Sequence, residues 1–240
     1  MSYYIGLSIL SNNSEGQCKR AERQKFLSAE AKCIVSRLAD KAFSEDDIAR
    51  ERQGRPFFLG PDLDFSISHS GTLAAVSFVR GANLRTGCDV ELVRPRVRAK
   101  EIAEENFSAP ERDYIFSSGC FDETKFYSIW TLKECYLKLR GLQVFDMPGV
   151  PSFIDGEDPC RGNFVFCTAV PSLLLFRLYE LSVVTGERYM LATVIEGMEL
   201  DPEIRWFSQA STEAFSPIRA STLSAKIFGQ TKQESPALIS

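Results

Sequence analysis

One short segment, Gly87-Cys88-Asp89-Val90-Glu91, constrains the fold most, because its polar and apolar side chains alternate. Successive side chains of a strand point to opposite faces, so Asp89 and Glu91 share one face while Cys88 and Val90 share the other. The two acids then lie about 7 Å apart at their backbones. Carboxylates at that spacing can converge on one hard cation such as Mg²⁺, which takes one or two protein carboxylates. The apolar back face predicts that this strand is anchored in a core.

A second segment, residues 130–138, predicts a helix with two different sides. Its expected buried stripe recurs at helical spacing and contains Ile129, Leu132, Tyr136 and Leu139. On the opposite side, Thr131, Glu134 and Lys138 share a face, with Glu134 and Lys138 four residues apart. A surface pair of this kind stabilises a helix by about 0.2–0.5 kcal/mol and needs no function. The spacing alone therefore leaves both interpretations open.

Two further blocks precede these segments, Gly54-Arg55-Pro56 and the heptapeptide FSISHSG at 65–71. In this order, the four blocks resemble the 4′-phosphopantetheinyl transferases, specifically the larger Sfp-like branch. The family patterns are G-K-P, F-N-x-S-H-(S/T)-x-G, G-(I/V)-D-(I/V)-E and W-(T/S)-x-K-E-(A/S)-x-x-K. The resemblance covers residues 25–145 at the level of motifs.

The resemblance implies both a fold and an activity. The fold is α+β, with two similar α+β halves in one chain related by pseudo-twofold symmetry and the active site between them. The activity, of the holo-[acyl-carrier-protein] synthase type, is transfer of the 4′-phosphopantetheine group from coenzyme A to a serine of an apo acyl- or peptidyl-carrier protein. It depends on Mg²⁺ and releases adenosine 3′,5′-bisphosphate.

The resemblance also implies roles for individual residues. Asp89, Glu91 and Glu134 would hold Mg²⁺, and Asp89, Glu134 and Lys138 would be catalytic, with Glu134 as the base. The coenzyme would be bound by residues matching the family's basic and polar positions, namely Arg55, Ser68, His69, Lys133, Lys138, Lys25 and Lys32.

Several of these positions also have plainer interpretations. His69, the only histidine, sits where a strand ends and can be a hydrogen-bonded turn residue; Arg55 lies in a Gly-x-Pro turn. Lys133 either touches phosphate or extends its stem along the helix. Glu111 matches a family acid, but Ser108 three residues earlier makes a capping box the favoured interpretation.

The order of predicted elements supports an α+β architecture. Strands are expected at 1–10, 65–68, 73–79, 86–93, 164–170, 173–184 and 189–196, and helices around 31–42, 99–106, 110–117 and 126–139. We expect an N-terminal α+β half at 1–97, a C-terminal α+β half at 98–206 and a peripheral tail at 207–240. The family's Gly-x-Gly turn is replaced here by Gly141-Leu142-Gln143, which leaves the shape of that loop open.

Composition sets the remaining expectations. The chain has 240 residues, 44% of them hydrophobic, and a net charge of −4, which is typical of a soluble cytoplasmic protein and predicts neither nucleic-acid nor membrane binding. Seven cysteines without a C-x-x-C pair favour buried thiols in a reducing compartment. Basic runs at 19–32 and 94–100 are either solvated faces or attract anionic coenzyme A and an acidic carrier. One chain holding the whole cleft predicts a monomer.

Two other classes of function remain open. A different Mg²⁺-dependent phosphoryl-transfer enzyme could use the same carboxylates, and a non-catalytic module could bind coenzyme A or a carrier without modifying it. No P-loop or G-x-G-x-x-G motif supports a nucleotide-binding fold of another kind.

Replacement of Asp89 tests the metal-site interpretation. We expect Asp89→Ala to abolish turnover with Mg²⁺ and coenzyme A while the circular dichroism spectrum keeps its shape. Full activity of this variant would remove Asp89 from the mechanism.

Overall fold

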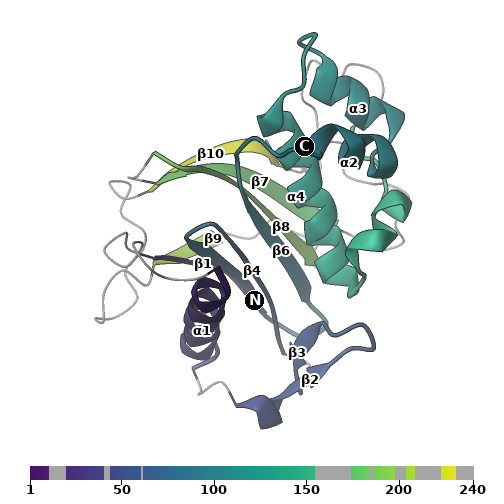
Figure 1. Ribbon diagram of the computed structural model, residues 1–240. Helices are drawn as coiled ribbons and strands as arrows, with labels where there is room; N and C mark the ends of the chain where they lie inside the picture. Colours follow the sequence, from purple (N-terminus) through teal and green to yellow (C-terminus); the bar gives the residue numbers. More distant parts are fainter. Residues whose placement is uncertain are drawn as a thin grey trace, which may run out of the picture.

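The computed structural model describes residues 1–10, 20–40, 44–60, 62–154, 174–183, 186–197, 204–208 and 223–230. Within these residues the chain forms four layers, with one helix, two four-stranded sheets and a group of three helices packed in that order (Figure 1). The predicted α+β class is confirmed. Two short strands, β2 (Ile48–Arg50) and β3 (Pro56–Phe58), form a separate hairpin.

The first sheet has the spatial order β4 (Leu63–Ser70), β5 (Leu73–Arg80), β1 (Ser2–Ile9) and β9 (Ile204–Ser208). Its neighbours are antiparallel except for β1 and β9, which are parallel. The helix α1 (Arg20–Ala39) covers the outer face, where Leu27, Ile34 and Val35 pack against aromatic side chains of the sheet. This packing buries the apolar stripe of an otherwise charged helix.

The second sheet is antiparallel throughout, in the order β10 (Leu223–Gln230), β7 (Leu174–Val183), β8 (Arg188–Glu196) and β6 (Arg85–Leu92). Its outer face is covered by α2 (Ala99–Asn106), α3 (Ala109–Phe116) and α4 (Glu123–Arg140) (Figure 1). Along β7, Phe176 and Leu178 face these helices, whereas Leu175 and Tyr179 face the first sheet. Both faces of β7 are therefore buried, as its long apolar run requires.

Most predicted elements are present, with some differences in extent. Helix α1 begins at Arg20, eleven residues before the expected start. The apolar periodicity did not reveal these residues as helical, because the first turns of the helix are mostly charged and polar. The expected strand at 164–170 lies outside the described residues. Part of the expected peripheral tail forms β10, which pairs with β7. No described helix is long and apolar enough to cross a membrane.

Strands β6 and β9 cross the expected boundary between the two halves. β6 precedes residue 97 but belongs to the second sheet, and β9 follows it but belongs to the first. Each sheet therefore takes one strand from the other part of the chain, which ties the two sheets together covalently as well as by packing.

The edge strands β4 and β6 lie side by side and are joined through side chains. The Thr86 amide donates to Asp64 Oδ2 (2.8 Å), and the Leu92 amide donates to Ser70 Oγ (3.1 Å). Between these two pairs, the Val90 amide donates to Ser68 Oγ. In all three pairs the partners are 22 residues apart in the sequence. This constant offset means that the two strands run parallel. Side chains of β4 thus satisfy amides that an edge strand would otherwise leave unpaired.

Helix α4 approaches β6 closely at one glycine. A Cβ atom at Gly87 would lie 2.5 Å from the Cys135 carbonyl oxygen and 3.0 Å from a Val194 methyl group. The backbone of the helix cannot move away without disturbing the buried contacts of α4. Gly87 therefore sets the distance between the strand that carries Asp89 and the helix that carries Glu134 and Lys138.

Gly87→Ala should consequently overpack this contact and lower the free energy of unfolding by about 1–3 kcal/mol. Gly149→Ala is the matched control, since a Cβ at Gly149 meets no atom within 4 Å. Chemical denaturation of both variants makes the measurement. Equal stabilities would show that α4 and β6 tolerate a wider separation.

Candidate active site

The central contact of the site joins Lys138 of α4 to Asp89 of β6. Lys138 Nζ lies 2.7 Å from Asp89 Oδ1 and 2.8 Å from Ser68 Oγ on β4. Ser68 also donates to Asp89 Oδ1 at 2.8 Å. Burial lowers the pKa of Lys138, but the Asp89 carboxylate outweighs it, and the pKa is raised overall. Lys138 is therefore a permanent cation at the meeting point of three elements.

Two more carboxylates lie near Asp89. Glu91, next along the same face of β6, accepts a hydrogen bond from Ser70 Oγ at 2.9 Å. Burial and the Asp89 charge raise the pKa of Glu91. Burial and Asp89 also raise the pKa of Glu134 to about 7, against an opposing effect of Lys138. The mutual repulsion shows that the three predicted acids share one electrostatic environment.

The acidic group has one feature that suits a cation. Asp89 Oδ2 is buried and makes no hydrogen bond, while Oδ1 is occupied by Lys138 and Ser68. A buried carboxylate oxygen without a partner is a favourable position for a hard cation. Among the described residues, however, no three His, Cys, Asp or Glu side chains are arranged to hold a metal ion. Joint ligation by Asp89, Glu91 and Glu134 stays a prediction.

A cleft of about 970 Å³ opens beside these acids and is strongly basic. Arg23 reaches it from α1, and Arg94, Arg96 and Arg98 line it from the segment between β6 and α2. Arg96 also lies over the Trp130 ring of α4, 5.1 Å from the ring centroid. The two basic runs of the sequence thus supply arginines to one cleft, which can attract an anionic ligand.

His69 lines the same cleft, together with Gly71 and Glu91. Burial and the Lys138 charge lower the pKa of His69 below its ordinary value of 6.5. The imidazole is therefore neutral at pH 7 and can both donate and accept a hydrogen bond. His69 thus shares the cleft with the arginines, and its contact with coenzyme A stays a prediction.

Lys25 and Lys32, the predicted ligands of the coenzyme, do not line this cleft, and their role stays a prediction. Both residues line a separate shallow depression on the outer surface of α1. Lys25 is about 200° around the helix from Arg23, and Lys32 about 180°, from 100° per residue. Of the charged run at 19–32, it is Arg23 that lines the cleft. The angular phase of a helix starting near residue 20 would have selected Arg23.

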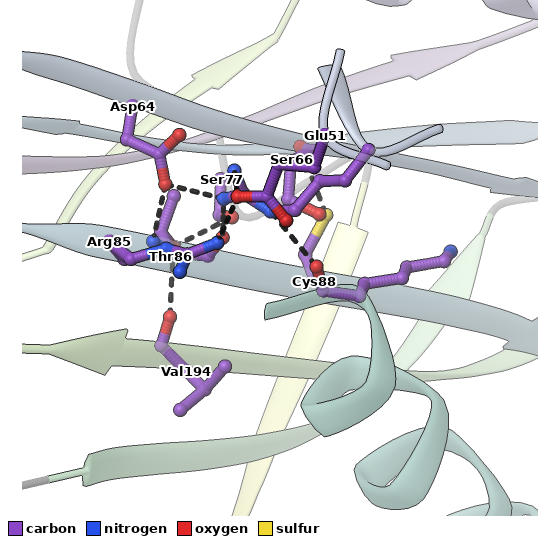
Figure 2. Close-up of polar contacts among 10 residues, drawn as sticks. Glu51, Asp64, Ser66, Ser77, Arg85, Thr86, Cys88 and Val194 are labelled. Carbon is purple, nitrogen blue, oxygen red and sulfur yellow. Dashed lines mark hydrogen bonds and ion pairs between the residues drawn. The ribbon is translucent and has the colours of Figure 1, made fainter. Parts of the chain in front are cut away.

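Arg55, another predicted ligand of the coenzyme, does not line the cleft. Its guanidinium is buried; Nε donates to the Lys138 carbonyl (3.0 Å), and Nη2 pairs with Asp64 and donates to the Thr86 carbonyl (3.0 Å). Figure 2 shows Asp64 directed at Thr86, which also contacts Val194 of the neighbouring strand. Arg55 thus contacts protein groups rather than the cleft.

Lys133 and Ser68 are likewise buried and bonded to protein groups, and their predicted contacts with the coenzyme stay predictions. Lys133 is 1% exposed, and its ammonium lies 3.1 Å from Glu111 Oε2 and 3.1 Å from the Val150 carbonyl. Ser68 is also buried, and its hydroxyl is used by Lys138, Asp89 and the Val90 amide.

The capping-box interpretation of Glu111 is confirmed. Glu111 Oε2 accepts from the Ser108 amide at 2.9 Å, and Ser108 Oγ caps the Glu111 amide. Oε1 accepts from the Phe153 amide at 2.9 Å. Together with Lys133, these bonds fix the segment around Phe153 against α3 and α4.

Comparison with known proteins agrees with this geometry. Residues 85–193, which hold Asp89, Glu91, Glu134 and Lys138, match the 4′-phosphopantetheinyl transferase superfamily. The match covers 109 of the 240 residues, so this segment of the chain is similar to that superfamily. Arg55, which precedes the match, lies outside the matched residues.

Individual relatives carry the same description. A putative 4′-phosphopantetheinyl transferase of Haemophilus influenzae is 29% identical over 132 residues, 53% of this chain and 56% of the relative. The 4′-phosphopantetheinyl transferase AcpT of Salmonella typhimurium is 35% identical over 103 residues (42% and 52%), and Sfp of Bacillus subtilis is 27% identical over 143 residues (56% and 62%). The chain thus spans about half the length of the curated relatives it matches.

The raised pKa of Glu134 predicts a pH dependence of stability in metal-free protein. From pH 4.5 to about 7 the unfolded chain has released this proton while the folded chain retains it, so the free energy of unfolding falls as pH rises. Denaturation across this range should show a decline that is weaker in Glu134→Gln. Identical pH profiles for both proteins would contradict the assigned environment.

Proposed function

We propose that this protein transfers the 4′-phosphopantetheine group of coenzyme A to a serine hydroxyl of an apo acyl- or peptidyl-carrier protein. One observation carries the proposal. The half-buried Lys138–Asp89 contact lies within the segment that matches the superfamily, and Glu91 of the same strand lines an arginine-rich cleft. A lysine and a group of acids beside a basic cleft suit a reaction in which a diphosphate is both bound and cleaved.

The cleft accounts for coenzyme binding. Coenzyme A carries a diphosphate and a 3′-phosphate, and arginine can grip phosphate with two parallel hydrogen bonds. Arg23, Arg94, Arg96 and Arg98 supply four such groups from two sides of the cleft, and neutral His69 adds a donor. The diphosphate would lie at the end nearest Lys138, with the nucleotide toward α1.

In the proposed reaction, the serine oxygen forms a bond to the phosphorus that carries the pantetheine group. The bond from that phosphorus to the bridging oxygen of the diphosphate breaks, and adenosine 3′,5′-bisphosphate leaves. Glu134, which lies near both Asp89 and Lys138, would accept the serine proton. Lys138 offsets negative charge as it develops on the phosphate oxygens.

We propose that a Mg²⁺ ion completes the site. Asp89 would hold it through its unpaired oxygen, joined by Glu91 and Glu134. The ion would supply charge neutralisation at the diphosphate. Because a cation stabilises ionised carboxylates, added Mg²⁺ should lower the titration midpoint of Glu134, which can be followed by carboxyl NMR without turnover.

The remaining properties follow from the same proposal. The protein would be a monomeric cytoplasmic enzyme of the Sfp-like branch, with two halves related by a pseudo-twofold axis. Two features support this arrangement. Each four-stranded sheet has helical cover on its outer face, and each contains one strand that comes from the opposite part of the chain.

Mass spectrometry of several apo carriers incubated with coenzyme A and Mg²⁺ tests the function. We expect a phosphopantetheine adduct on the carrier that disappears when a chelator is added. Turnover of nucleotides or simple phosphoesters without a carrier would instead favour another phosphoryl-transfer enzyme. Tight coenzyme A binding with every carrier left unmodified would favour a non-catalytic module.

Lys138→Ala should lower kcat by about 10²–10³-fold, which is the usual cost of losing one group that stabilises charge in the transition state. The matched control is Lys125→Ala on the same helix, because Lys125 lies over the Tyr114 ring and outside the site. Steady-state kinetics and helical circular dichroism make the comparison. Equal kinetics for the two variants would reduce Lys138 to a structural ion pair.

A further inference from the structure

The buried guanidinium of Arg55 contacts all three elements that build the site. Nε donates at 3.0 Å to the carbonyl of Lys138 in the last turn of α4, which otherwise accepts only the long 3.3 Å bond from the Gly141 amide among the described residues. Nη2 donates to the carbonyl of Thr86 on β6 and pairs with Asp64 on β4. No ligand needs to be present for these contacts, since all partners belong to the protein.

Asp64 completes the arrangement. Its Oδ2 accepts from the Thr86 amide at 2.8 Å as well as from Arg55, so one carboxylate oxygen links β4 both to β6 and to the arginine. Burial raises the pKa of Asp64, and the Arg55 charge opposes that effect. Asp64 is the nearer counter-charge of Arg55, with Glu51 Oε1 at 3.8 Å as the second, and removal of Asp64 would leave a buried guanidinium poorly compensated.

We propose that Arg55 and Asp64 are positioning residues, which set the place of Lys138 relative to Asp89 without touching the coenzyme. This inference rests on the proposed function. Arg55 fixes the backbone of Lys138, and Asp64 fixes the backbone three residues before Asp89. These two backbone contacts would set the distance between the Lys138 ammonium and the Asp89 carboxylate. Neither Arg55 nor Asp64 lines the cleft.

The chemistry of arginine explains why this chain has Arg where the family pattern has Lys. A guanidinium presents donors in a rigid planar fork and can reach several acceptors in different directions at once. A lysine ammonium is a single point on a flexible stem and cannot span a helix carbonyl, a strand carbonyl and a carboxylate in the same way. Direct phosphate binding by Arg55 would require it to give up these bonds.

The test compares Arg55→Lys and Asp64→Asn with Arg85→Lys. Arg85 is the matched control, since its guanidinium forms its ion pair with Glu51 rather than with Asp64 (Figure 2). For both site variants we expect kcat to fall about tenfold to a hundredfold, the cost of a small misplacement, with KM for coenzyme A within about twofold of wild type. The control should keep wild-type kinetics.

Two kinetic outcomes would overturn the proposal. A raised KM for coenzyme A with unchanged kcat in Arg55→Lys would mean that Arg55 binds the coenzyme. A lowered melting temperature with wild-type kcat per folded molecule would mean that the pair is merely structural.

A crystal structure of Arg55→Lys tests the positioning role without any measurement of activity. Its result therefore does not depend on whether the proposed transferase function is right. We expect Lys138 Nζ and Asp89 Oδ1 to move apart from 2.7 Å to beyond hydrogen-bond distance. An unchanged distance would contradict positioning. If the wild-type protein modifies no carrier, the proposed function fails, while this distance still tests whether Arg55 places Lys138. Asp64→Asn serves the same comparison if Arg55→Lys does not fold.

Discussion

The contact between the Lys138 ammonium and the Asp89 carboxylate is the interaction on which this structure depends. The Asp89 carboxylate is buried and the Lys138 side chain is 31% exposed, so the lysine supplies the counter-charge that the buried acid needs, and Ser68 completes the contact from a third element. These bonds hold α4, β6 and β4 together at one point. The same arrangement leaves Asp89 Oδ2 without a hydrogen bond, and burial of Glu134 near Asp89 raises its pKa to about 7.

The junction between the two sheets explains why the site lies where it does. β4 and β6 are edge strands of two different sheets. The side chains of Asp64, Ser68 and Ser70 on β4 accept hydrogen bonds from the facing amides of β6. A seam built from polar side chains tolerates charged neighbours better than an apolar sheet interface would. The acids of β6 thus lie at the seam, and the arginines that follow β6 continue it into an open cleft.

The sequence predicted the elements of the site better than the directions of its long side chains. Strand alternation placed Asp89 and Glu91 on one face, and helical spacing placed Glu134 and Lys138 together. Arg55 and Lys133 could not be placed in this way, because whether a long cationic side chain reaches a ligand or a buried acid depends on distant residues such as Asp64 and Glu111. The pairing of β9 with β1 likewise depends on contacts far apart in the sequence.

The most direct measurement is a crystal structure of the protein with coenzyme A and Mn²⁺, which replaces Mg²⁺ at oxygen ligands and can be located by anomalous scattering. The account predicts an anomalous peak within bonding distance of Asp89 Oδ2, with the coenzyme diphosphate against Lys138 and the nucleotide among the arginines of the cleft. A peak elsewhere, or a coenzyme bound outside this cleft, would contradict it.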